Sequence, residues 1–241
     1  MAGTLYTGTS GYVFDQWKGV FYPEGLSPKR WLTWYASVLP SVEINYTFRR
    51  VPSEDVVARW RDQTPPHFRF TLKAHQRITH YRRLEGAGEY VDELVRAAAP
   101  LGERLGIILF QLPPNLKYEA DRLAGFLREL PSGPRYAMEF RHDSWYAPEV
   151  DEALAAHGVA RCGADTDAVA LEAIPVTAGH VYLRFRREAY TDRSIASWRR
   201  RIRPLLAEGR DVFCYFKHED GGKGPVWARA LQIRRGEGAP R

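Results

Sequence analysis

Charged side chains stand at the ends of several strand-like runs in this sequence of 241 residues. Glu43 lies in SVEIN, Lys73 in RFTLK and Glu139 in YAMEF, so each follows closely on apolar residues. Carboxylates gathered in one site can act as general acids and bases, and a desolvated lysine can act as a nucleophile. The sequence therefore predicts acid–base chemistry, with these three residues as the catalytic candidates.

Alternation along the strands predicts where these side chains point, because successive residues of a strand face opposite sides. Glu139 and Arg141 share one face, as do Arg184 and Arg186, and apolar neighbours occupy the opposite face. The outer face of a barrel strand packs on helices, so we expect the polar set to face inward and to converge at the carboxyl ends of the strands. Buried charges are costly unless they pair, so a purely structural ion-pair network is the alternative.

Polar and aromatic residues near the same strand ends complete the predicted site. The residues predicted to bind substrate are Ser10, Tyr12, Trp17, Asn45, Tyr46, His75, His80, Gln111, Arg141, His142, Trp145, Arg184, Arg186 and Lys217. Arginine and lysine side chains can clamp a phosphate or carboxylate through charge-assisted hydrogen bonds. Tyr12 and Trp17 lie in an aromatic-rich segment and are expected to stack on a planar ligand or a sugar.

Metal and cysteine signals are weak. No short-spaced motif of His, Cys or Asp indicates a metal site, and a triad of His75, His142 and Glu139 is the alternative that the strand ends allow. Cys162 and Cys214 lack a CxxC spacing, and we expect both to be buried free thiols. The sequence thus predicts no metal and no cofactor.

Eight strand-like runs alternate with amphipathic stretches. The runs are short, rich in β-branched or aromatic residues and bounded by Gly, Pro or Asn: Leu5–Thr9, Val42–Asn45, Phe68–His75, Gly106–Leu112, Tyr136–Arg141, Val159–Gly163, Val181–Arg186 and Val212–Lys217. Between the first two, Trp31, Trp34, Tyr35 and Val38 recur at helical spacing. The crossover after the sixth run shows no clear helical pattern.

This alternation predicts an α/β fold with parallel strands and helical crossovers. Eight strands in one chain of this length favour a single closed (β/α)8 TIM-type barrel, irregular at the sixth βα unit, over an open doubly wound sheet. The open sheet would carry a phosphate-binding glycine fingerprint after the first strand, and Gly8-Thr9-Ser10-Gly11 does not match it. We predict one domain over residues 1–241, with its core at about 4–233 and a frayed end at 236–241.

Composition narrows the class of protein. Hydrophobic residues make up 44% and charged residues 27%, which are values typical of globular proteins. No apolar run approaches the roughly 18 residues that span a bilayer, and no secretory signal is recognisable, so we expect a cytoplasmic protein without a membrane partner. The formal net charge of +6 permits an anionic partner. The dense basic run Arg199–Arg203 is expected to be a solvated helix face, so nucleic acid is a less favoured partner than a small anion.

Six segments resemble, in order, the motifs of the domain-of-unknown-function-72 (YecE-like) family: GTSGY, SVEINYTFRR, FRFTLKAHQRITH, LGIILFQLPPN, YAMEFRHDSWY and FCYFKHEDGGKGP. The resemblance runs from Leu5 to about Leu231 and implies a TIM-barrel-like fold with a cavity at the strand ends, but no established reaction. It places family signature positions at Ser10, Tyr12, Trp17, Glu43, Asn45, Tyr46, Lys73, Thr79, His80, Gln111, Glu139, Arg141, His142 and Trp145. Many relatives carry a His-Gly pair where this chain has Phe185-Arg186-Arg187.

Three functions fit these residues. The favoured one is an enzyme that acts on a small phosphate- or carboxylate-bearing substrate by acid–base chemistry, with the hydrolase, lyase and isomerase classes all open. A glycoside hydrolase using Glu43 and Glu139 is the second, although the surrounding cations fit a neutral sugar poorly. A nucleic-acid-binding module or nuclease is the third. The sequence does not fix the oligomeric state.

Overall fold

The structure, a computed structural model, describes residues 2–217 and 220–232 and forms an α/β fold with two parallel sheets. The strands are β1 (Leu5–Thr9), β2 (Ser41–Ile44), β3 (Arg69–Lys73), β4 (Leu105–Gln111), β5 (Tyr136–Glu139), β6 (Ala160–Arg161), β7 (Gly163–Asp165), β8 (His180–Phe185) and β9 (Asp211–Phe216). One sheet has the order β1-β9-β8-β7, and the other has the order β2-β3-β4-β5-β6. All their pairings within the described ranges are parallel, as the alternation of strands and helices predicts.

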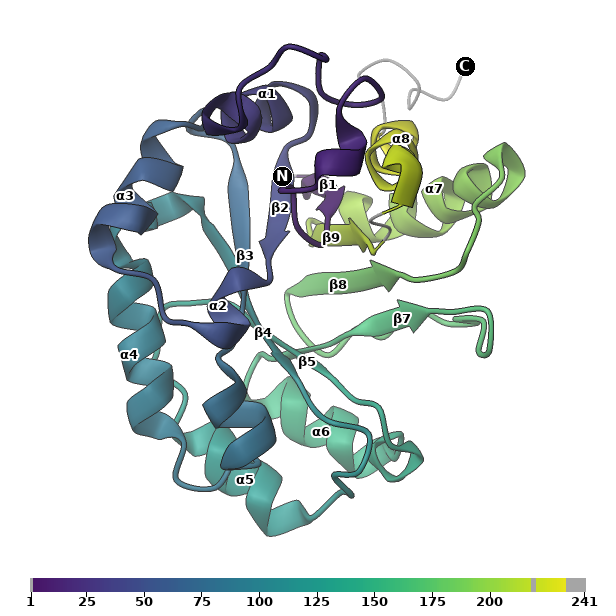
Figure 1. Cartoon of the computed structure of the whole chain (residues 1–241). Coiled ribbons are helices and arrows are strands. Elements are labelled where there is room, and N and C mark those ends of the chain that lie inside the picture. Colours follow the sequence, from purple (N-terminus) through teal and green to yellow (C-terminus); the bar gives the residue numbers. More distant parts are fainter. Residues whose placement is uncertain (1, 218–219, 233–241) are drawn as a thin grey trace.

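Helices cover the outside of these strands (Figure 1). They are α1 (Trp31–Val38), α2 (Tyr46–Arg49), α3 (Glu54–Asp62), α4 (Gly88–Ala98), α5 (Ala120–Arg128), α6 (Pro148–Ala156), α7 (Asp192–Ala207) and α8 (Lys223–Leu231). Local sequence sets some of their ends. Pro148 occupies the first turn of α6, where its missing N–H costs nothing. The hydroxyl of Thr191 accepts a hydrogen bond from the backbone N–H of Ser194 and so caps α7.

The two sheets approach each other at two places. Between β1 and β2, Ser10 and Glu43 form a single parallel bridge, and the backbone N–H of Gly11 donates to the carbonyl of Glu43 at 2.8 Å. At the other edges, only Cys162 separates β6 from β7, and its N–H donates to Met138 of β5 at 2.8 Å. Continuous ladders do not join the two sheets within the described residues, so the closed eight-stranded barrel stays a prediction.

The sixth βα unit is irregular, as predicted. Its single expected strand is split into β6 and β7, and residues 166–179, all of them described, hold no helix before β8 begins. The predicted frayed end at 236–241 lies outside the described residues.

Apolar side chains pack in two places. The larger cluster joins the strands to the surrounding helices. The smaller cluster takes side chains from both sheets, among them Tyr6 of β1, Ile107 and Leu109 of β4, and Tyr182 of β8. Its members therefore lie between the sheets, on the inward face from which the polar residues at the strand ends also project.

The two cysteines are buried free thiols, as the sequence predicts. Burial raises the pKa of the Cys162 and Cys214 thiols, so both stay protonated and unreactive near neutral pH. No helix in residues 2–217 and 220–232 combines the length and the apolar character that crossing a membrane requires.

Candidate functional site

The carboxyl ends of the parallel strands bring a set of polar side chains to one opening. These residues, which we call the mouth network, are Glu43, Lys73, Gln111, Glu139, Arg141, Tyr182, Arg184 and Arg186. Lys73, Gln111 and Glu139 are each the last residue of their strand. Parallel strands end at the same edge of a sheet, so residues far apart in the sequence meet here.

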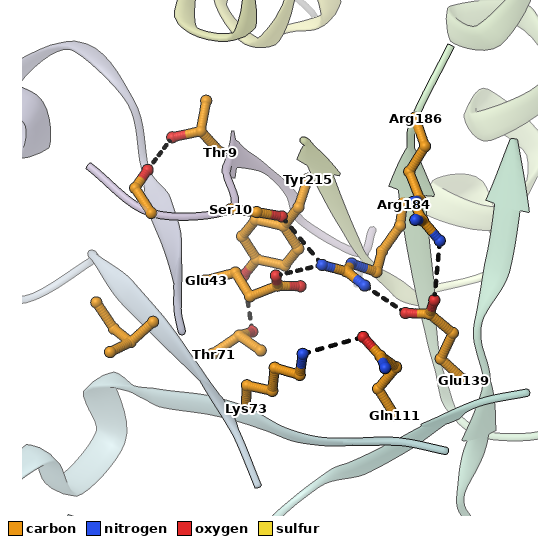
Figure 2. Close-up of polar contacts among 12 residues, drawn as sticks. Thr9, Ser10, Glu43, Thr71, Lys73, Gln111, Glu139, Arg184, Arg186 and Tyr215 are labelled. Carbon is orange, nitrogen blue, oxygen red and sulfur yellow. Dashed lines mark hydrogen bonds and ion pairs between the residues drawn. The ribbon is translucent and has the colours of Figure 1, made fainter. Parts of the chain in front are cut away.

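Arg184 lies at the centre of the mouth network, between two carboxylates (Figure 2). One end of its guanidinium donates to Glu43 Oε1 at 2.8 Å, and the other end donates to Glu139 Oε2. The side chains of these three residues are 0–2% exposed. A guanidinium that bridges two buried carboxylates compensates both charges, which makes this burial possible.

Tyr182 and Ser10 complete the surroundings of Glu43 and Arg184. The Tyr182 hydroxyl donates to Glu43 Oε2 at 2.5 Å, so both oxygens of Glu43 accept hydrogen bonds from buried donors. Ser10 Oγ lies 3.4 Å from Arg184 Nη2, a long contact. Glu43 therefore holds Arg184 in place and turns no oxygen toward the opening.

The rim of the mouth network is more exposed than its centre. Arg141 donates to Glu139 Oε1 at 3.2 Å, and Arg186 donates to the same oxygen at 3.3 Å. The side chains of Arg141 and Arg186 are 29% and 25% exposed, whereas that of Glu139 is 1% exposed. The opening therefore presents arginine donors, with the carboxylate behind them.

Gln111 links the rim to Lys73. Its Oε1 accepts from Lys73 Nζ at 3.0 Å and from Arg141 Nη2 at 2.9 Å. Lys73 Nζ also lies 4.1 Å from the centre of the Phe48 ring, which contacts His80 edge-on at 5.0 Å. Lys73 is half-buried between an amide oxygen and an aromatic face.

Electrostatics fix the charge of Glu139. Burial alone raises the pKa of this carboxyl, but the guanidinium groups of Arg184 and Arg141 outweigh burial and lower its pKa to about 2. For Arg184, burial acts against the charged form, while Glu139 and Glu43 outweigh it and raise the pKa further above the usual range. Glu139 and Arg184 are therefore both ionised at neutral pH.

Lys73 is the member of the mouth network that titrates near neutrality. Burial and the nearby Arg184 lower the pKa of its ammonium to about 8, although Glu43 and Glu139 act in the opposite direction. Burial, followed by the charges of Lys73 and Arg141, also lowers the pKa of His80. The charge arithmetic of the network is four cations minus two carboxylates, a net of +2 when Lys73 is protonated.

A pocket of about 520 Å³ opens beside Glu139 and the rim arginines. Arg141 and Arg186 line it together with Arg161, Asp143 and a wall of small and apolar residues. Arg161 is bound to Asp151 in an ion pair, with the two atoms 2.5 Å apart. The arginines of the lining outnumber its carboxylates, Glu139 and Asp143, by one, and Asp151 outside the lining compensates Arg161.

Several predicted binding residues lie outside the mouth network. Trp17 and Trp145 are fully buried: Trp17 packs on Phe14 and Phe21, and Trp145 stacks on Phe140 at 4.5 Å. Their rings pack on the chain's own side chains and have no exposed surface, so their predicted contact with a ligand has no support from this structure and stays a prediction.

Histidines near the strand ends have structural partners. His142 Nδ1 accepts from the backbone N–H of Ser144 and caps the short helix that follows β5. His75 Nε2 lies 3.2 Å from the carbonyl of Arg49. No group of three or more His, Cys, Asp or Glu suited to a metal occurs within 2–217 and 220–232, so the alternative triad of His75, His142 and Glu139 does not form.

The remaining predicted residues lie at the edge of the opening or away from it. Asn45 precedes α2 and is partly exposed, while Tyr46 is exposed and lies edge-on to Trp60. Tyr12 is half-buried, and burial raises the pKa of its phenol to about 12. Lys217 follows β9, its backbone N–H donates to the carbonyl of Phe185 at 2.9 Å, and its side chain is exposed, so its predicted contact with a ligand stays a prediction.

Sequence reasoning missed Tyr182 and Phe48. Tyr182 has the same parity as Arg184 in β8, a signal that could have placed its hydroxyl inside. Phe48 lies in α2, where no strand alternation applies, and no sequence signal connects it to Lys73.

The basic run Arg199–Arg203 belongs to α7, and part of it is used to hold other segments. Arg201 donates to the carbonyls of Leu171 and Glu172, and Arg199 donates to that of Ala230. The prediction of a solvated face holds for Arg200, whose side chain is exposed.

Comparisons with known proteins show which family and which relatives this chain resembles. The model of the family described as "Protein of unknown function DUF72" matches residues 6–240. UPF0759 protein YecE of Escherichia coli K12 is 33% identical over 156 residues, which cover 64% of this chain and 57% of YecE. UPF0759 protein YunF of Bacillus subtilis is 24% identical over 261 residues, 90% of each protein. The match to YecE thus spans a little over half of that relative.

Solved structures show the same fold. The crystal structure of a DUF72 family protein from Thermotoga maritima has a TM-score of 0.81 and 28% sequence identity, covering 95% of this chain and 97% of that one. A DUF72 family protein from Enterococcus faecalis has a TM-score of 0.79 and 20% identity, covering 95% and 94%, and supports the fold alone. None of these names states an activity or a ligand.

Proposed function

Because the chain belongs to the DUF72 family, whose description assigns no activity, we propose a function from the mouth network itself. The protein binds a small phosphate- or carboxylate-bearing substrate at the carboxyl ends of its strands and acts on it by proton transfer. The observation that carries this proposal is the excess of cations over carboxylates, with the cations Arg141 and Arg186 on the accessible side.

Arg141 and Arg186 are suited to hold an anion. A guanidinium has five N–H donors in a planar fork that matches carboxylate and phosphate oxygens. The contacts among described residues use Nε and Nη2 of Arg141 and Nη1 of Arg186. The other donors of both side chains can therefore bind oxygens of a ligand in the adjacent pocket.

Lys73 is the group that we propose for proton transfer. A general acid or base works best when its pKa lies near the working pH, and the pKa of Lys73 is lowered to about 8. The sequence offered Glu43 or Glu139 for this role, but the pKa of Glu139, lowered to about 2, keeps that carboxyl ionised. We assign Glu43 and Glu139 to holding the arginines, and Lys73 to the chemistry.

The two alternatives receive less support. A glycosidase needs two carboxylates that flank the scissile bond, whereas Arg184 fills the space between Glu43 and Glu139. Nucleic-acid binding needs a continuous exposed basic surface, and in the run on α7 Arg199 and Arg201 are bound to carbonyls of this chain.

We also propose that the two sheets together make an eight-stranded TIM-type barrel with one interruption. The bridge between Ser10 and Glu43 supports contact of β1 with β2. The single residue Cys162 between β6 and β7 supports reading them as one bent strand that pairs with β5 on one side and β8 on the other. The inward apolar cluster beneath the mouth network fits the layered interior of such a barrel.

Calorimetric titration with inorganic phosphate tests the anion site. We expect the wild-type protein to bind phosphate, and Arg186→Gln to weaken binding roughly tenfold or more, because a charge-assisted contact contributes about 1.5–3 kcal/mol. Arg200→Gln removes an exposed arginine of α7 and is the matched control, with unchanged affinity. Wild-type protein that binds neither phosphate nor any of a panel of phosphomonoesters and carboxylates would overturn the proposal, as would equal affinity in Arg186→Gln.

A further inference from the structure

Lys73 is held in a way that leaves its amine able to react. Its Nζ makes one hydrogen bond, to Gln111 Oε1 at 3.0 Å, and rests on the Phe48 ring. A neutral amine keeps two N–H groups and gains a lone pair, so the hydrogen bond to Gln111 survives deprotonation. The side chain therefore stays in place when it becomes nucleophilic.

The amine is also adjacent to the proposed anion clamp. Lys73 Nζ and Arg141 Nη2 share Gln111 Oε1 as acceptor, so these two nitrogens lie within about 6 Å of each other. An oxyanion bound to Arg141 thus brings the next one or two atoms of the same molecule to Lys73. A carbonyl carbon attached to a carboxylate, or close to a phosphate, falls at that distance.

We propose that Lys73 is a nucleophile that forms an imine with an aldehyde or ketone group of an anionic substrate, an inference that rests on the proposed anion site. The neutral amine adds to the carbonyl carbon, and the C–N bond forms as the C=O π electrons move to oxygen. The resulting carbinolamine then loses one water molecule, made of that oxygen and the two former amine protons, and a C=N bond remains. No oxidant or reductant is needed. The substrate class is a 2-oxo acid or a phosphate-bearing aldehyde or ketone.

The acidity of Lys73 supports the same step. Burial, followed by the nearby Arg184, lowers the pKa of its ammonium to about 8. At pH 7.5 about a quarter of such a lysine is neutral, a fraction about two hundredfold higher than for a lysine with the ordinary pKa. The chain has only six lysines, so the other five serve as internal standards for reactivity.

Reductive trapping tests this inference. The protein is incubated at pH 7.5 with pyridoxal 5′-phosphate, an aldehyde that carries phosphate, then treated with sodium borohydride, digested and mapped by mass spectrometry. We expect the adduct at Lys73 to exceed the mean of the other lysines roughly tenfold or more. Excess inorganic phosphate should reduce the adduct at Lys73 alone, and pyridoxal without phosphate should label Lys73 less.

Variants separate this inference from the proposed function. Lys73→Arg keeps the positive charge and should abolish the selective adduct while phosphate binding persists, and Lys223→Arg, at an exposed lysine, should leave it unchanged. Labelling of Lys73 no greater than that of the exposed lysines, in protein that still binds phosphate, overturns the imine and leaves the anion site standing. Loss of both phosphate binding and selective labelling in the wild-type protein overturns both.

Discussion

Replacing Glu139 by Gln removes the carboxylate that three arginines share. Glu139 lies 3.2 Å from Arg141 and 3.3 Å from Arg186, and it also pairs with Arg184. Its pKa falls from the ordinary 4.5 to about 2, despite burial. That shift of about 2.5 units corresponds to about 3 kcal/mol of net stabilisation at neutral pH. Leaving Arg184 without this partner can raise the cost to about 5 kcal/mol.

Chemical unfolding in guanidinium chloride at pH 7 measures this loss. We expect the free energy of unfolding of Glu139→Gln to fall by about 3–5 kcal/mol, and Tm to fall by roughly 6–12 °C or more. Glu24→Gln changes an exposed glutamate and should stay within about 0.5 kcal/mol of the wild-type protein.

The stability that Glu139 contributes should depend on pH in a defined direction. A carboxyl with a lowered pKa in the folded state contributes stability above its unfolded pKa and loses it as the pH falls toward the folded pKa. The difference between wild type and Glu139→Gln should therefore be constant above pH 4.5 and shrink as the pH falls from 4.5 toward 2. Equal stability of the two proteins at pH 7 would refute the claim that the buried ion pairs hold the site together.

Two further variants and one titration test other contacts of the structure. Tyr182→Phe removes the donor to Glu43 Oε2 and should cost about 1–3 kcal/mol in unfolding free energy, because a buried carboxylate oxygen loses its partner. An NMR titration of dimethylated lysines should find Lys73 with a pKa near 8, well below the other lysines. Gly8→Ala should have a lower Tm than the wild-type protein, because the added Cβ would lie 2.0 Å from the carbonyl oxygen of Ser41, where β1 contacts β2.

A control variant and defined contrary results distinguish these specific effects from a general loss of stability. Tyr46→Phe, at an exposed phenol, should leave unfolding free energy unchanged, and a similar loss in both tyrosine variants would contradict the specific role of Tyr182. An ordinary lysine pKa at Lys73 would contradict its burial beside Arg184. A fully stable Gly8→Ala would mean that β1 and β2 do not pack as closely as the structure has them.

Strand alternation predicted much of the site. In β5 and β8 the inward parity of Glu139 and Arg184 followed from apolar neighbours that belong against helices, and both side chains do project inward. Lys73 was found in the same way, whereas Gln111 was found because it ends the apolar run of the fourth strand. At Lys217, which directly follows the last residue of β9, the backbone still pairs with Phe185 but the side chain is exposed, so alternation alone does not give its contacts.

Other features needed three-dimensional information. In the sequence, a tryptophan that stacks on a ligand cannot be told from one that packs in the core. For Trp17 and Trp145 only the structure shows that both side chains are buried. The pairing of one guanidinium with both carboxylates cannot be read from composition, and it is the reason why we propose that Glu139 holds the arginines and does not act as the general acid or base. The irregular sixth βα unit was signalled by the missing helical pattern after the sixth run, but the split of that strand into β6 and β7 at Cys162 was not.

A crystal structure of the wild-type protein soaked with tungstate, a heavy-atom substitute for phosphate, would show directly whether the mouth network binds an anion. We expect an anomalous peak within hydrogen-bond distance of both Arg141 and Arg186, with the Glu43–Arg184–Glu139 bridge intact behind it. An anion bound only elsewhere, or an Arg184 that contacts neither carboxylate, would contradict this expectation.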